Sequence, residues 1–70
     1  MLVCEMFTGK MADLPAGSEA REHNGFRFQI FRQGDLTAVF WPEGAVVCVL
    51  ISDGPPEDVV QLAFAKAMAP

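Results

Sequence analysis

Hydrophobic residues dominate the second half of the chain, from Leu36 to Met68, and they fall into three runs. The first two runs, at 36–41 and 45–52, flank a short turn and each has the length of a β-strand. The third run, at 56–69, repeats its apolar residues at helical spacing. The pattern predicts two adjacent antiparallel strands followed by one amphipathic helix.

Neither strand alternates apolar and polar residues, as a strand with one solvated face would. In the first of them, both the odd-numbered and the even-numbered positions are largely apolar. One helix covers only one face of a sheet, so the other face needs a second cover. We predict that this second face mediates self-association or binds a partner. The interface candidates are Phe31, Val39, Trp41, Val47 and Val49.

Trp41 has two interpretations that the residues alone leave open. It precedes Pro42 at the end of a strand, where it could anchor an interface, because tryptophan is enriched in binding hot spots. It could equally pack at the end of the chain's own core.

The first half of the chain is expected to extend the same sheet. Further strands are predicted near 2–8, 19–24 and 26–33, with a loop at 9–17. Asn24-Gly25 favours a type I′ hairpin turn, because both central residues of that turn need a positive φ. In the strand that follows, Phe26, Phe28 and Ile30 share one face. Short turns between successive strands predict a mostly antiparallel meander of four or five strands.

The predicted fold is therefore a single α+β domain covering residues 1–70, with the C-terminal helix packed on one face of the sheet. Glu57 and Asp58 support the start of that helix, because acidic residues in the first turn complement the helix dipole. A 70-residue chain buries only about 60% of the surface that its unfolded form exposes, yet 51% of its residues are hydrophobic. Dimerisation is a usual solution for such a chain, so we predict a homodimer.

The charge distribution argues against a nucleic-acid partner, and the length of the apolar runs argues against a membrane-spanning helix. The net charge is −4, and the five basic residues are scattered along the chain. Nucleic-acid binding requires a basic patch, so we expect no nucleic-acid partner. The longest apolar run, 45–51, is far shorter than the ~20 residues that a membrane helix needs, so this segment itself is expected to make no membrane contact.

Catalytic, cofactor and metal motifs are absent from the sequence. Nucleophilic catalysis needs a nucleophile beside a base, and the only Cys and His residues are Cys4, Cys48 and His23, which are spread along the chain. No glycine-rich phosphate loop occurs. We predict no enzymatic activity, no cofactor and no zinc site, because structural zinc usually takes four ligands.

The two cysteines lie in separate predicted strands and have two interpretations. Cys4 and Cys48 are either buried free thiols, which behave as small hydrophobic residues, or partners in a disulfide between neighbouring strands, which would imply an oxidising compartment.

Short motifs along the whole chain resemble the C-terminal domain of membrane-anchored bacterial anti-sigma factors. The likeness runs through REHNG, RQGDLTAVFWPEGAVVCVLISD and PEDVVQLAFAKAM, and LVCEMF resembles the opening strand of that domain. The matching positions are Arg21, Gly25, Gly34, Val39, Trp41, Gly44, Ser52-Asp53 and Glu57.

The resemblance implies an extracytoplasmic tail that senses or relays a signal. If the resemblance does not hold, a cytoplasmic location is expected. The chain has neither the zinc-binding HxxxCxxC pattern nor the membrane helix of that family, so a fragment or a free-standing relative of the tail is expected. An oxidising location would favour the disulfide.

We therefore expect a non-enzymatic interaction or sensory module that self-associates through the second sheet face. The alternative is a small protein that binds an apolar molecule at that face or in a dimer groove, since such sites are lined by aliphatic and aromatic residues.

Overall fold

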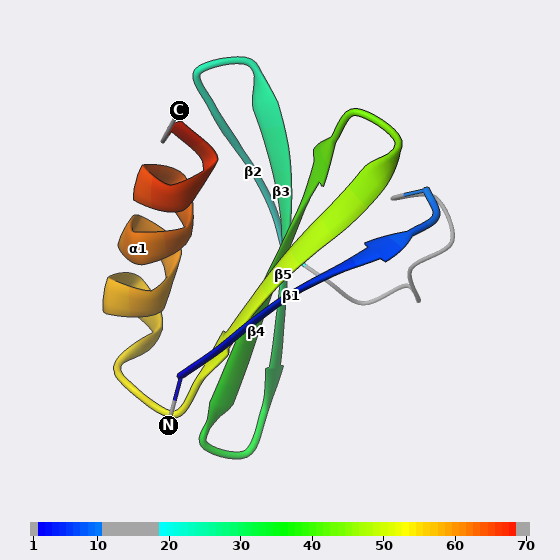
Figure 1. Cartoon of the computed structure of the whole chain (residues 1–70). Coiled ribbons are helices and arrows are strands. Elements are labelled where there is room, and N and C mark those ends of the chain that lie inside the picture. The colour runs from blue at the N-terminus through cyan, green and yellow to red at the C-terminus, as the bar shows by residue number, and fades with distance from the viewer. Residues whose placement is uncertain (1, 11–18, 69–70) are drawn as a thin grey trace.

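The computed structural model describes residues 2–10 and 19–68. In this part of the chain, five strands form one antiparallel sheet, and a helix lies against one of its faces (Figure 1). The elements are β1 (Leu2–Thr8), β2 (Glu19–His23), β3 (Phe26–Gln33), β4 (Leu36–Glu43), β5 (Val46–Ser52) and α1 (Pro56–Met68). This is the α+β fold that the sequence predicts.

The strand order across the sheet is β1-β5-β4-β3-β2, and every neighbouring pair is antiparallel. Strands β2 to β5 form a meander in which each strand pairs with the one before it. β1 instead joins the far edge beside β5, with Leu2 opposite Ser52 and Thr8 opposite Val46. Most of the loop predicted at 9–17 lies outside the described residues.

Two-residue turns connect the strands of the meander. Asn24 and Gly25 have φ values of 51° and 84°, as a type I′ turn requires. The β4–β5 turn consists of Gly44 and Ala45, with Glu43 opposite Val46. β4 therefore continues past the predicted end at Trp41 and includes Pro42.

Pro42 is accommodated because it lies near the end of its strand. The pairing of β4 with β3 runs from Leu36 to Phe40, so Pro42 lies beyond that ladder and the missing N–H breaks no bond to β3.

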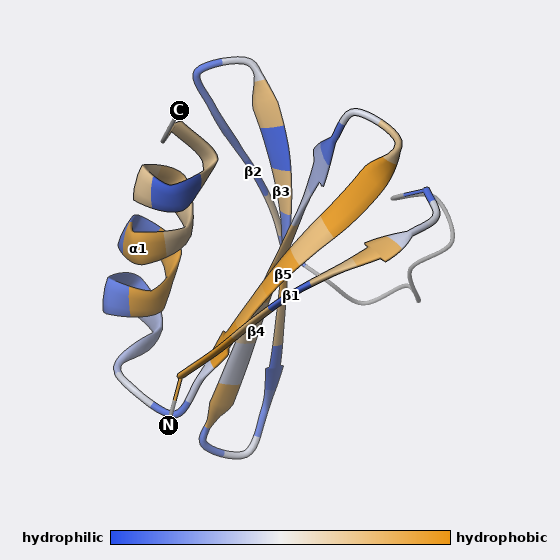
Figure 2. Ribbon diagram, in the orientation of Figure 1, coloured by the Kyte–Doolittle hydropathy of each residue, from blue (hydrophilic) through white to orange (hydrophobic). Residues whose placement is uncertain are grey.

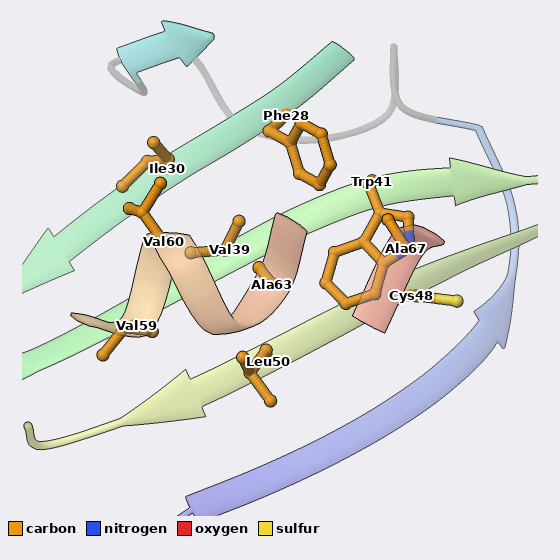
Figure 3. Close-up of a cluster of buried hydrophobic side chains, with 10 residues drawn as sticks. All are labelled: Phe28, Ile30, Val39, Trp41, Cys48, Leu50, Val59, Val60, Ala63 and Ala67. Atoms are coloured by element: carbon orange, nitrogen blue, oxygen red, sulfur yellow. The ribbon is translucent and has the colours of Figure 1, made fainter. Parts of the chain in front are cut away.

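The hydrophobic core lies between α1 and the three central strands. Figure 3 shows side chains from α1 meeting side chains from β3, β4 and β5. The buried cluster consists of Phe28, Ile30, Val39, Trp41, Cys48, Leu50, Val59, Val60, Ala63 and Ala67. β5, which has a partner on each side, is hydrophobic along most of its length, whereas the edge strand β2 is mainly hydrophilic (Figure 2). Small residues of α1, Ala63 and Ala67, let the helix backbone approach the sheet.

Candidate functional site

The sheet face opposite α1 is apolar along its inner strands β4 and β5, and no other described helix or strand covers it. We call this surface the open face. Its apolar side chains alternate with those of the core cluster: Val3, Phe7, Phe31, Leu36, Ala38, Phe40, Val47, Val49 and Ile51.

Three phenylalanine rings form a row across the open face. The rings of Phe7 and Phe40 meet edge to face, with centroids 6.3 Å apart and planes at 76°. Phe40 meets Phe31 in the same way, at 5.4 Å and 82°. The row joins β1, β4 and β3, so it spans most of the width of the sheet.

The three rings of the row and Leu36 are accessible on the open face. Phe7 and Leu36 are each 41% exposed, and Phe31 and Phe40 are half-buried. Val47 and Val49 are only 1% and 4% exposed. Since β5 lies between β1 and β4, the contact between Phe7 and Phe40 passes over β5 and helps to cover these two valines.

The structure divides the predicted interface candidates between the two faces of the sheet. Phe31, Val47 and Val49 lie on the open face. Val39 and Trp41 lie beneath α1 in the core, where they are 0% and 2% exposed, so their assignment to the second face is wrong.

The hairpin register explains this correction. The two-residue turn at 34–35 pairs Gln33 with Leu36, which sets Ile30 opposite Val39 and Phe31 opposite Ala38. Opposite residues share a face. Val39 therefore joins Ile30 in the core, and Trp41 follows two residues later on the same side.

Six exposed or half-buried members of the open face were not among the sequence candidates: Val3, Phe7, Leu36, Ala38, Phe40 and Ile51. Leu36 and Phe40 could have been found from the sequence, because a two-residue turn at 34–35 places both on the same face of the sheet as Phe31. Phe7 could not be found in this way, since its strand pairs with β5 across a long stretch of chain.

A shallow hollow of about 190 Å³ lies at the end of the open face near the β3–β4 turn. Its lining residues are Phe31, Gln33, Leu36, Ala38 and Ile51. It is an apolar depression beside the aromatic row.

A second hollow, of about 240 Å³, lies on the α1 side of the sheet. We call it the sulfur hollow, because Cys4, Met6 and Cys48 all line it, together with Glu5, Trp41, Glu43 and Lys66. Met6 lies directly opposite Cys48 in the β1–β5 register, while Cys4 is opposite Leu50. Cys4 and Cys48 are therefore diagonal neighbours, and both are free thiols in the structure.

Cys48 holds its proton firmly. Its Sγ donates a hydrogen bond of 2.8 Å to Oε2 of Glu43. Burial, followed by this bond and by the negative charge of Glu43, raises the pKa of the Cys48 thiol to about 12. Figure 3 shows its sulfur directed away from the centre of the core cluster.

Trp41 also lines the sulfur hollow and carries a buried polar atom. Its indole Nε1 has no hydrogen-bond partner. The ring lies against Phe28, with centroids 5.8 Å apart. The structure therefore resolves the two interpretations of Trp41 in favour of core packing.

A charged contact ties β2 to the first turn of α1. Arg21 donates from Nε to Glu19 at 2.8 Å and from Nη2 to Glu57 at 3.4 Å. These bonds and charges raise the pKa of Arg21. The contact is exposed, so it positions the edge strand more than it stabilises the fold.

Across residues 2–10 and 19–68, no three His, Cys, Asp or Glu side chains are grouped so as to hold a metal ion. The described helix is too short and too polar to cross a membrane.

Comparisons with protein-family models, with curated proteins and with solved structures give no match to this chain.

Proposed function

We propose that this chain is a non-enzymatic protein-interaction module and that its open face binds a second copy of the same chain. The observation that carries the proposal is the accessible aromatic row of Phe7, Phe40 and Phe31. Interface cores are enriched in aromatic residues and depleted in charge.

A second copy suits this surface for two reasons. A chain of 70 residues gains stability by association, because a domain of this size buries a smaller share of its surface than a larger domain does. In a twofold dimer the same patch meets itself, and the centre of the open face is apolar and free of charge. Glu5 on β1 and Arg27 on β3 lie on opposite sides of that centre by alternation along their strands. A twofold axis parallel to the strands therefore brings Glu5 of each copy to the side that carries Arg27 of the other.

The test is the solution mass of the protein by size exclusion with light scattering. The expected mass is twice that of the 7.6 kDa chain. Leu36→Lys, on the open face, is expected to yield a monomer, because a charge buried in the dimer interface is costly. Leu62→Lys is the matched control, because Leu62 lies on α1 and its exposure is 40% against 41% for Leu36.

Two outcomes would overturn the proposal. One is a wild-type chain that stays monomeric at millimolar concentration. The other is an equal dimer fraction for the Leu36→Lys and Leu62→Lys variants, because the dimer would then not depend on the open face.

We further propose that the module serves as a sensory tail of the kind found in membrane-anchored anti-sigma factors. The support is the motif resemblance, in which Gly25, Gly34 and Gly44 occupy the β-hairpin turns. The test is genomic: the native gene should encode an upstream membrane segment and zinc motif and lie beside a sigma-factor gene. A free-standing frame without such a neighbour would contradict the proposal.

The apolar hollow on the open face favours a second candidate function, the binding of a small apolar molecule. A ligand in this hollow of about 190 Å³ would touch Phe31 and Leu36 and therefore compete with the second copy. A panel of apolar compounds should raise the melting temperature and reduce the dimer fraction together. A panel with no effect on either quantity would exclude this candidate.

A further inference from the structure

We propose that the sulfur hollow binds a soft monovalent metal ion, Cu(I), through Cys4, Met6 and Cys48. The proposal goes beyond the interaction function, because this hollow lies on the α1 side of the sheet and the aromatic row of the open face takes no part in it.

The β1–β5 register brings the three sulfur-bearing residues together. Met6 and Cys48 are directly opposite each other, and Cys4 is two residues from Met6 on the same face of β1. All three line one hollow of about 240 Å³. Met6 is 68% exposed, so its flexible side chain can turn towards an ion beside the two thiols.

The diagonal placement of the cysteines suits a bridging ion better than a disulfide. Diagonal neighbours in an antiparallel pair have Cα atoms roughly 7–8 Å apart. A disulfide requires Cβ atoms about 3.5–4.5 Å apart. A metal ion between the sulfurs adds two metal–sulfur bonds, each about 2.3 Å in zinc sites, and so spans a wider gap.

The donor atoms select the class of metal. Thiolate and thioether sulfurs are soft ligands, and they favour Cu(I). Zinc prefers four ligands from cysteine, histidine or carboxylate side chains, and the described residues hold no such group of three. Cu(I) needs fewer ligands, so two thiolates and one thioether suffice.

Binding exchanges protons for the ion without a redox change. The S–H bonds of Cys4 and Cys48 break, two sulfur–copper bonds form, and two protons pass to solvent. The resulting bis-thiolate complex carries one negative charge. Lys66, on the rim of the hollow, offsets this charge, whereas Glu43 opposes it.

The hydrogen bond from Cys48 to Glu43 must break when the ion binds. Glu43→Gln removes a carboxylate that contacts the Cys48 sulfur and whose charge opposes the negatively charged copper complex. This variant should therefore bind Cu(I) more tightly than the wild type, an effect that a structural role of Glu43 would not produce.

The experiment is an anaerobic titration of the reduced full chain with Cu(I) supplied as its bicinchoninate complex. The wild type should remove one equivalent from the chelator. Cys4→Ser should weaken binding by at least about 100-fold, since even outer-shell changes cost 10–100-fold. Met6→Leu should weaken it by about tenfold, equivalent to 1.4 kcal/mol.

Met68→Leu is the matched control, because Met68 is also an exposed methionine but accepts a hydrogen bond from Asn24 away from the hollow. Cys4 and Met6 are exposed, so their variants should fold, and circular dichroism checks this. The proposal is overturned if the wild type leaves Cu(I) with the chelator, or if Cys4→Ser and Met6→Leu bind as tightly as Met68→Leu.

Discussion

The thiol of Cys48 is held in its neutral form by its surroundings. Burial is the largest cause, and the hydrogen bond to Glu43 is the next. An exposed cysteine has a pKa of about 8.5, whereas that of Cys48 is raised to about 12. The folded chain therefore keeps a proton that the unfolded chain releases in mildly alkaline solution.

We predict that alkaline pH destabilises the domain through Cys48. The pKa is higher in the folded state, so the stabilisation is fully present below the unfolded pKa and is lost as pH rises towards about 12. The free energy of unfolding should fall by at most about 1.4 kcal/mol per pH unit above pH 9. Urea unfolding between pH 8 and about 10.5 measures the slope. A Cys48→Ala variant with the same slope as the wild type would contradict this prediction.

For Trp41 and Val39, hydrophobicity alone predicts burial, but the sheet face on which each side chain lies depends on the register between β3 and β4. Both are buried. The two-residue turn at 34–35 determines that register. Pairing the strands from this turn would have placed both residues correctly from the sequence.

At the scale of elements, local signals predicted the fold well. The turn at Asn24-Gly25 and the acidic first turn of α1 lie where the sequence places them. The pairing of β1 with β5 was beyond prediction, because its partners, from Thr8 and Val46 to Leu2 and Ser52, lie 38 to 50 residues apart in the sequence and no turn specifies it. The sulfur hollow depends on that pairing, so it was also beyond prediction, as was the position of Phe7.

Helix α1 depends on its contacts with the sheet for stability. Phe64 is half-buried, stacks on His23 with centroids 4.3 Å apart, and meets the ring of Phe28 at 4.7 Å. Phe64→Asp removes these contacts and places a charge against the core, so it should destabilise the domain by about 3 kcal/mol or more. Thermal unfolding followed by circular dichroism measures the change. Ala65→Asp, at an exposed position of the same helix, is the control, and an equal loss in both variants would refute the helix placement.

At the scale of the whole molecule, no other helix or strand of the described residues covers the sheet face opposite α1. α1 and the inner side of the sheet form the core, and the outer side carries the aromatic row. The sequence predicts this imbalance, because both faces of β4 and β5 are apolar. It does not reveal that Phe7 and Phe40 cover Val47 and Val49. Because these two valines are buried, the aromatic rings form the proposed contact surface.

The most direct test of the central claim is an isotope-filtered nuclear Overhauser experiment on a mixture of labelled and unlabelled chains. If the open face binds a second copy, ring protons of Phe7, Phe31 and Phe40 should show cross-peaks to open-face side chains of the other chain. Cross-peaks that connect α1 of one chain to the other, or no cross-peaks between chains at millimolar concentration, would contradict the account.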